Sequence, residues 1–382
     1  MTEDDPNPAR PNDPTSRRKR IEASPHWRDG RFRDLLERED PKGWSILRDW
    51  VLAKSPHRVP AEPIPTVRRT ADDFREPPSS GLRVTWLGHS SSLVEIDGAR
   101  VLLDPVFGKR VSPFAWAGPK RFFEPPMRAS ELPPLDAVAI SHDHYDHLDR
   151  PTIVELSSLD VPFVVPLGVG AHLERWGVAP ERITELDWWE SHRVGPVTLT
   201  ATPARHFSGR AMTMTDRDRT LWAGWALTGP EHRVYFSGDT AMFPGFAEIG
   251  ERLGPFDAAL VEAGAYSPLW RDVHIGPEQA VVACELVRGA LLMPVHWGTF
   301  DLAMHAWTEP IERILAAAAS AGVPVAAPRP GASFEPASAP AVERWWPELP
   351  WRGPAEDPVV SSGLAGALRE RILRVGAAAS AG

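Results

Sequence analysis

Four potential metal ligands lie within six residues, directly after a short apolar run, and this arrangement constrains the fold more than any other part of the chain. The run is 137–140, and His142, His144, Asp146 and His147 follow it with the spacing H-x-H-x-D-H. Burying several polar groups where a core strand ends is costly unless they have partners. Imidazole and carboxylate are donors that zinc binds in proteins. The pattern therefore predicts a strand that ends at a zinc site.

Three later apolar runs also end at a potential ligand. The ligands are His206 after the run 197–202, Asp239 after 233–236 and His296 after 291–295. In α/β folds the carboxyl ends of parallel strands share one edge of the sheet, and sites are built at that edge. The sequence therefore predicts one site that gathers all seven ligands.

Seven ligands exceed the needs of one four-coordinate zinc, so two metals are implied. We expect His142, His144 and His206 on the first metal and Asp146, His147 and His296 on the second, with Asp239 as the bridge. Each metal then keeps an open position, which is typical of catalytic zinc. Two metals about 3.5–4 Å apart can share a hydroxide whose pKa falls to about 7. Asp146 and Asp239 are therefore also expected to be catalytic residues, with no Ser or Cys nucleophile.

The composition excludes several classes of protein. Of the 382 residues, 42% are hydrophobic and 24% are charged, as in a soluble globular protein. The net charge of -9 argues against a nucleic-acid partner. The single cysteine, Cys284, excludes an internal disulfide framework and favours a reducing compartment, so we expect a cytoplasmic protein. The longest uncharged run, 314–328, is too short and too broken to cross a bilayer.

Four segments are expected along the chain: a disordered tail at 1–20, an N-terminal segment at 21–80 that packs on the main domain, a catalytic domain at 81–336 and a partly disordered extension at 337–382. Apolar residues recur at roughly helical spacing within 25–55. They are Trp27, Phe32, Leu35, Leu36, Trp44, Ile46, Leu47, Trp50 and Val51. The final stretch, 353–382, is rich in Ala and Gly and predicts a weakly ordered tail with one short helix.

From residue 82 the pattern is one of strands and short turns. Strands are expected at 82–87, 92–96, 100–103, 137–140, 163–165, 197–202, 220–228, 233–237, 258–262 and 291–295. Asp97-Gly98 is a hairpin signal between the second and third of these strands. A helix is expected at 277–288, with Pro277 in its first turn and Gly289 as its C-terminal cap. Two sheet-forming halves with outer helices predict a layered α/β sandwich.

The chain also resembles the metallo-β-lactamase-fold hydrolases. Within that superfamily it is most similar to the N-acylphosphatidylethanolamine-hydrolysing phospholipase D family, over about 82–335. The segments that carry the resemblance are 86–89 (Trp-Leu-Gly-His), 104–107, 118–122, 131–137, 141–149, 185–190 (Glu-Leu-Asp-Trp-Trp-Glu), 246–257 and 296–300 (His-Trp-Gly-Thr-Phe).

The resemblance implies a four-layer αβ/βα sandwich, two zinc ions and hydrolysis of a phosphodiester such as N-acylphosphatidylethanolamine through a metal-bridging hydroxide. It also implies roles for two further residues. Asp104 would contact a ligand histidine on the side away from the metal and so orient its ring. His274 would steady the phosphate or protonate the leaving group. The sequence departs from the family at Ala115 and Trp116, which stand where the phospholipase has a Gln-Tyr pair associated with its substrate site.

Other functions stay open at this point. A lactonase or esterase, like the bacterial ascorbate-6-phosphate lactonases, would direct the same hydroxide at carbon. An iron-dependent redox enzyme and a non-catalytic lipid- or metal-binding protein are further alternatives. The segment 105–128 mixes aromatic and cationic residues, which suits peripheral contact with the inner face of an anionic membrane. Inward packing of those aromatics is an equal alternative. The sequence does not indicate an oligomeric state.

Overall fold

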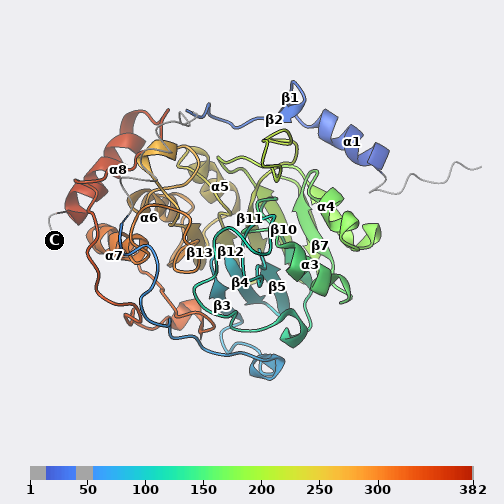
Figure 1. Cartoon of the computed structure of the whole chain (residues 1–382), viewed down its shortest axis with the longest axis horizontal. Coiled ribbons are helices and arrows are strands. Elements are labelled where there is room, and N and C mark those ends of the chain that lie inside the picture. Colours follow the sequence, from blue (N-terminus) through green and yellow to red (C-terminus); the bar gives the residue numbers. More distant parts are fainter. Residues whose placement is uncertain (1–13, 40–54, 381–382) are drawn as a thin grey trace, which may run out of the picture.

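The computed structural model describes residues 14–39 and 55–380, whose strands form two mixed sheets and a separate hairpin (Figure 1). The hairpin pairs β1 (Trp27–Arg28) with β2 (Arg31–Phe32). In spatial order, the seven-stranded sheet contains β15 (Ser333–Phe334), β3 (Leu82–Gly88), β4 (Ser91–Ile96), β5 (Ala99–Leu103), β6 (Ala137–Ala139), β7 (Phe163–Pro166) and β8 (Ile183–Leu186). The six-stranded sheet contains β14 (Leu292–Val295), β13 (Ala258–Glu262), β12 (Arg233–Phe236), β11 (Gly224–Thr228), β10 (Val197–Thr202) and β9 (Ser191–Val194).

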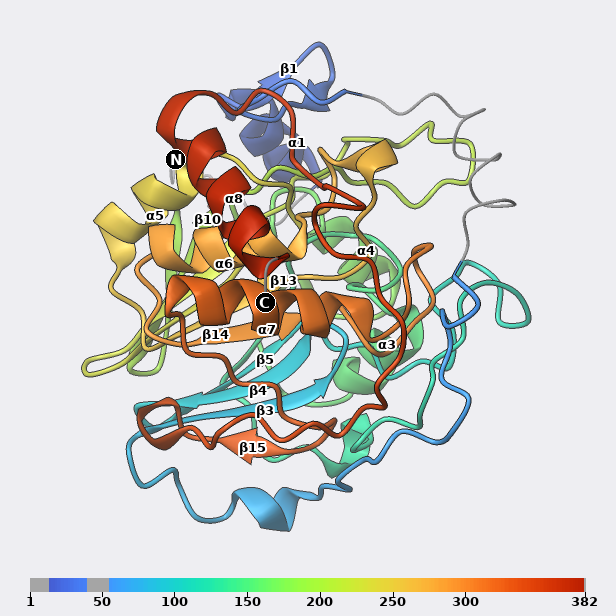
Figure 2. The same ribbon diagram turned by 90° about the vertical axis from the view of Figure 1, so that its left-hand side faces the viewer.

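Helices cover the outer faces of both sheets (Figures 1 and 2). The seven-stranded sheet is flanked by α3 (Arg150–Ser157) and α4 (Gly170–Arg175), and the six-stranded sheet by α5 (Gly245–Leu253), α6 (Pro277–Leu286), α7 (Glu309–Ala321) and α8 (Gly366–Ala379). An N-terminal helix, α1 (Pro14–Ala23), and the 3-10 turns η1 (Ala71–Phe74), η2 (Ala129–Glu131), η3 (Pro180–Arg182), η4 (Pro268–Trp270) and η5 (Pro336–Ser338) complete the elements. The predicted four-layer αβ/βα sandwich is confirmed.

Alternating side chains explain why the seven-stranded sheet is buried on both faces. Val101 and Leu103 of β5 pack in the core between the sheets, whereas Leu102 packs in a second core under α3 and α4. In β6 and the residue after it, Ala137 and Ala139 face the first core while Val138 and Ile140 face the second. Because side chains alternate along a strand, continuous apolar runs of this kind belong to doubly covered sheets.

The N-terminal region differs from the sequence expectation. Residues 14–20, assigned above to a disordered tail, form most of α1. Arg17 anchors this helix through ion pairs with Glu174 (2.5 Å) and Glu185 (2.6 Å), contacts that no local sequence pattern reveals. Trp27 and Phe32, expected in a helical pattern, face each other across the β1–β2 hairpin instead. Trp44, Ile46, Leu47, Trp50 and Val51 lie outside the described residues.

Several predicted boundaries also change. The run 220–228 forms a strand only from Gly224, and β8 and β9 were not predicted because their sequences mix polar and apolar residues. Pro277 does begin α6, but Gly289 does not take a left-handed conformation; Arg288 does, with φ 63°. Gly289 is required by close packing, since a Cβ there would lie 2.8 Å from that of Ala259.

The C-terminal region is more ordered than expected. Instead of a weakly ordered tail, residues 366–379 form α8, which packs on α6 and α7 and buries Ile372. None of the helices within 14–39 and 55–380 is long and apolar enough to cross a bilayer.

Candidate metal centre

Strand direction brings the predicted ligands to one edge of the sandwich. In the seven-stranded sheet, β3, β5 and β6 run in the same direction, and in the six-stranded sheet β10, β12, β13 and β14 do. The carboxyl ends of these strands meet where the two sheets face each other. All seven predicted ligands lie there, as the interatomic distances below show.

The first group of ligands consists of His142, His144, His206 and Asp239. His144 Nδ1 lies 2.9 Å from His142 Nε2 and 3.2 Å from His206 Nε2. Asp239 Oδ2 lies 3.9 Å from His142 Nε2 and 3.8 Å from His206 Nε2. Three imidazole nitrogens and a carboxylate oxygen thus converge, as at a zinc site.

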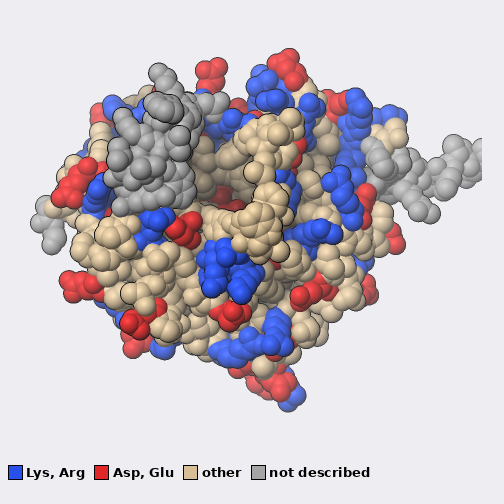
Figure 3. All heavy atoms as spheres, in the orientation of Figure 1, with Lys and Arg blue, Asp and Glu red and all other residues tan. Residues whose placement is uncertain are grey.

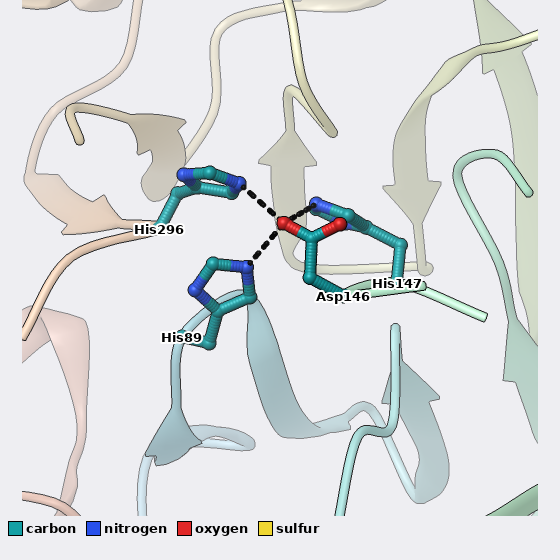
Figure 4. Close-up of side chains that lie close together, drawn as sticks. All are labelled: His89, Asp146, His147 and His296. Carbon is teal, nitrogen blue, oxygen red and sulfur yellow. Dashed lines mark hydrogen bonds and ion pairs between the residues drawn. The ribbon is translucent and has the colours of Figure 1, made fainter. Parts of the chain in front are cut away.

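The second group contains the predicted Asp146, His147 and His296, joined by His89 (Figure 4). Asp146 Oδ2 lies 3.2 Å from the Nε2 atoms of both His89 and His296, and 3.7 Å from His147 Nε2. Figure 4 shows the three rings surrounding the Asp146 carboxylate, with His89 approaching from the end of β3.

Asp239 faces both groups. Besides the contacts to the first group, its Oδ1 lies 3.1 Å from His147 Nε2 and its Oδ2 lies 3.1 Å from His296 Nε2. This carboxylate is 1% exposed, so it is held almost entirely away from water. The geometry suits the bridging position predicted for it.

Residues behind the ligands fix the ring orientations. His147 Nδ1 donates to Asp104 Oδ2 at 2.7 Å, which leaves Nε2 toward the site. Asp104 also accepts from the backbone N–H and the hydroxyl of Ser141, both at 2.6 Å. His206 Nδ1 donates to the Val273 carbonyl at 2.8 Å, so its Nε2 faces the first group. Such contacts set the tautomer and direction of a metal-binding histidine.

His274 lies beside both groups, with its ring 5.2 Å from that of His206 and 5.3 Å from that of His296. Its Nδ1 donates a hydrogen bond to the buried carboxylate of Glu262. Glu262, Asp239, His274 and His296 also form a third group that meets the spacing for a metal. His274 therefore lies at the site, as the family resemblance implied.

Backbone strain accompanies the site. His89, Asp104 and His296 have φ values of 53°, 38° and 66°, in the left-handed region that non-glycine residues seldom adopt. Each follows the last residue of its strand, where the turn must be abrupt. Gly264 permits the approach at His296, because a Cβ there would lie 2.0 Å from the His296 carbonyl oxygen.

The histidines of the site differ in charge. Burial lowers the pKa of His142 and His206 well below the ordinary value, so both rings are neutral. Burial has the same effect on His296, but Asp239 and Asp146 outweigh it and raise its pKa to about 10. Burial would raise the pKa of Asp239, yet His147 and His296 hold it well below its usual range. Without metal, His147 and His296 of the second group hold protons, whereas burial and the neighbouring His296 lower the pKa of His89 to about 3. A bound cation would displace those protons.

The donors fit a cation. Within the described part of the chain, His147 Nε2 and Asp239 Oδ1 are buried and make no hydrogen bond, although they lie 3.1 Å apart. Buried polar atoms without partners are rare in folded proteins. A cation between them would satisfy both atoms, which is the role that the sequence predicted for this place.

A cavity of about 570 Å³ opens beside the ligands. Its floor includes His144, Asp146, Asp239, His274 and His296, and its walls include Phe207, Met214, Arg217, Trp270 and Leu302. Figure 3 shows a hollow on this face of the molecule, with acidic side chains visible within it. A largely apolar cavity with a few convergent polar groups is the usual form of a small-molecule site.

His89 and Glu262 lie at the site although neither was among the residues predicted for it. His89 directly follows β3 and Glu262 is the last residue of β13, so both lie at the end of a strand. Gly88 separates His89 from the predicted strand 82–87 and favours a turn at this position. Glu262 lies inside the predicted strand 258–262 and not after it.

Three comparisons place the chain among known proteins. Residues 99–297 match the family described as the beta-lactamase superfamily domain. An uncharacterized protein of Mycobacterium tuberculosis is 48% identical over 336 residues, covering 85% of this chain and 88% of that protein. N-acyl-phosphatidylethanolamine-hydrolyzing phospholipase D 1 of Caenorhabditis elegans is 40% identical over 251 residues, covering 63% of this chain and 69% of that enzyme.

A solved structure agrees with these matches at the level of the fold. The isothiocyanate hydrolase from Delia radicum gut bacteria has a TM-score of 0.53 and 19% identity, and covers 66% of this chain and 98% of its own. The chain therefore belongs to the beta-lactamase superfamily and is a metallo-β-lactamase-fold hydrolase similar to N-acyl-phosphatidylethanolamine-hydrolyzing phospholipase D.

Proposed function

We propose that this hydrolase is a dinuclear zinc phosphodiesterase of the phospholipase D type, acting on N-acylphosphatidylethanolamine or a similar phosphodiester. The observation that carries the proposal is the position of Asp239, which faces two groups of histidines at once. Two zinc ions held there would supply Lewis acidity toward a phosphoryl oxygen and an activated water. His142, His144 and His206 would hold one ion, and Asp146, His147 and His296 the other.

The cavity supports a lipid-like substrate. Phe207, Met214 and Trp270 give it apolar walls beside the ligands, and Arg217 adds a cation. Apolar walls suit acyl chains, and a guanidinium suits a phosphate. The similarity to a phospholipase D of this specificity points in the same direction.

We also propose that the face around the cavity contacts an anionic membrane surface. The loops 105–120 and 207–218 project to the same side of the molecule in Figure 2. On them, Phe114, Trp116 and Met212 are 40%, 78% and 75% exposed. Lys109 and Lys120 of the same loop are also exposed. Exposed aromatics next to cations are typical of surfaces that bind lipid headgroups.

The test is phosphatidate release from N-acylphosphatidylethanolamine in detergent micelles by the zinc-loaded protein. We expect release by the wild type and by Asp97→Asn, and none by Asp239→Asn. Asp97 makes a suitable control because it lies in the turn between β4 and β5, where it hydrogen-bonds to His232. This turn lies at the amino end of β5, opposite the carboxyl end that faces the ligands. Absence of release, with cleavage of a lactone instead, would replace the phosphodiesterase assignment by the lactonase one.

A further inference from the structure

Glu262 is a buried carboxylate that is not one of the proposed metal ligands. It ends β13 and has no exposed surface. Its Oε2 accepts from the Thr240 backbone N–H at 2.6 Å, and its Oε1 accepts from His274 Nδ1. Its own N–H donates to the hydroxyl of Ser237 at 2.9 Å. Both carboxylate oxygens are therefore engaged, and the side chain is held in one orientation.

These contacts determine which atom His274 presents to the cavity. The described residues hydrogen-bond to His274 only through Nδ1, and the ring is 16% exposed on the cavity side of both ligand groups. With Nδ1–H committed to Glu262, Nε2 is the atom that can meet a substrate. A carboxylate behind a histidine fixes tautomer and direction in many active sites.

The contacts favour this role over metal ligation by Glu262. Its Oε2 and Oε1 are engaged by the Thr240 N–H and by His274, and Oε1 lies 3.9 Å from His296 Nδ1. His296 turns its other nitrogen, Nε2, toward Asp146 and Asp239. Glu262 thus stands behind His274.

We propose that Glu262 is a positioning residue that directs His274 Nε2 at the oxygen of the leaving group, so that His274 acts as the general acid. This inference rests on the proposed phosphodiesterase function. The attacking water forms the new P–O bond as the bond to the leaving oxygen breaks. That oxygen takes the proton from Nε2, while Nδ1–H stays on Glu262. The proton lost by the water replaces the one that His274 gave up, so the reaction balances.

The test compares two diesters with leaving groups of different basicity: N-acylphosphatidylethanolamine, which releases an alcohol, and phosphatidyl-4-nitrophenol, which releases a weakly basic phenolate. For Glu262→Gln and His274→Gln we expect kcat on the first to fall about 10²–10⁴-fold, the range of general acid catalysis. On the second, the loss should stay below about tenfold. The double variant should lose no more than either single one, because the two residues act as a unit.

Metal content and proton NMR distinguish positioning from a merely structural role. Both variants should keep the metal content of the wild type. The zinc-loaded wild type should show a low-field resonance from His274 Nδ1–H that both variants lack. Asp97→Asn removes a carboxylate from an equivalent contact, Asp97 to His232 Nδ1 at 2.6 Å, and should change none of these readouts.

Equal losses on both substrates, or loss of metal from Glu262→Gln, would overturn the inference and make Glu262 a ligand or a structural residue. If the metal-loaded wild type cleaves neither diester, the phosphodiesterase proposal fails and the general-acid role fails with it. The low-field resonance still reports the positioning contact separately, since it does not depend on turnover.

Discussion

One oxygen of Asp239 lies 3.1 Å from a nitrogen of His147, and the other lies 3.1 Å from a nitrogen of His296. The same carboxylate also faces the first group of histidines. No other carboxylate among the described residues contacts both ligand groups in this way. At the scale of single residues, the site thus depends most on this side chain.

Asp239→Asn should therefore weaken both metals together. Residues behind the ligands already contribute about 10–100-fold to metal affinity, so we expect a loss of about 100-fold or more for this variant. Metal content after dialysis, measured by mass spectrometry, checks this. Two retained metals with normal turnover would contradict the ligand assignment.

Asp104→Asn should affect the second group selectively. Asp104 accepts from His147 Nδ1 at 2.7 Å, and an amide in its place is a weaker acceptor. We expect the affinity for one metal to fall about 10–100-fold while the other is retained. Titration of the metal-free variant with zinc in a calorimeter checks this. Two unchanged binding steps would show that Asp104 does not support His147.

At the scale of elements, the ligands lie at the ends of the strands, and the loops provide the exposed surface around the site. The segment 105–128 shows how one element can divide between two roles. Phe122 and Phe123 pack against the main core, whereas Phe114 and Trp116 contact each other at the surface. Arg121, one of the cations of this segment, is buried against Phe123 and Phe300, and burial lowers its pKa to about 10.

Trp116→Ala should weaken binding to vesicles that contain anionic lipid. Loss of about 1.4 kcal/mol of apolar contact corresponds to about tenfold in affinity. Co-sedimentation with phosphatidylglycerol vesicles measures the effect, and zinc content should not change. Leu373→Ala gives a matched control, because Leu373 is 47% exposed on α8, on another side of the molecule (Figure 2). Equal binding by wild type and Trp116→Ala would exclude this loop from the membrane contact.

At the scale of the whole molecule, both terminal regions brace the site. Arg205 directly precedes His206 and is 1% exposed. Its guanidinium donates to the carbonyls of Glu37 at 2.7 Å and Ser362 at 2.9 Å. Asp272, two residues before His274, accepts from the backbone N–H of Ser362 at 2.7 Å. Segments distant in the sequence thus converge behind two histidines of the site.

Arg205→Lys should loosen this junction. Lysine keeps the charge but cannot donate to several carbonyls at once, so buried carbonyls lose their partners. We expect a loss of about 1–3 kcal/mol in the free energy of unfolding and weaker zinc binding by the first group. Urea unfolding of metal-free protein measures the first effect. Arg18→Lys, at an exposed pair with Glu22, should change neither quantity.

The pH dependence of stability should change when metal binds. In the metal-free protein the pKa of His296 is raised to about 10 from an ordinary value of 6.5. Its contribution is present below pH 6.5 and is lost as pH rises toward 10, with a slope of at most about 1.4 kcal/mol per pH unit for one proton. Unfolding of chelator-treated protein from pH 7 to 10 should show this decline, and His296→Gln should reduce it. Zinc-loaded protein should lack it, because the cation replaces the proton.

Much of the site could be predicted because a potential ligand follows each of four predicted strands within four residues. The sequence by itself determined the kind of ligand, its place at a strand end and the layered α/β fold, since these depend on neighbouring residues and on alternation along a strand. His142, His206 and His296 are examples of ligands whose place at a strand end could be predicted in this way. Local sequence also identified the H-x-H-x-D-H motif, whose members are close together before any sheet forms.

Only the tertiary structure decided which strand ends meet. The approach of His89 to Asp146, of Glu262 to His274 and of Arg205 to both terminal regions joins residues from different elements of the chain. Such contacts depend on how two sheets stack and on which loop covers which edge. No local pattern encodes these distances, because each is set by the packing of the whole core.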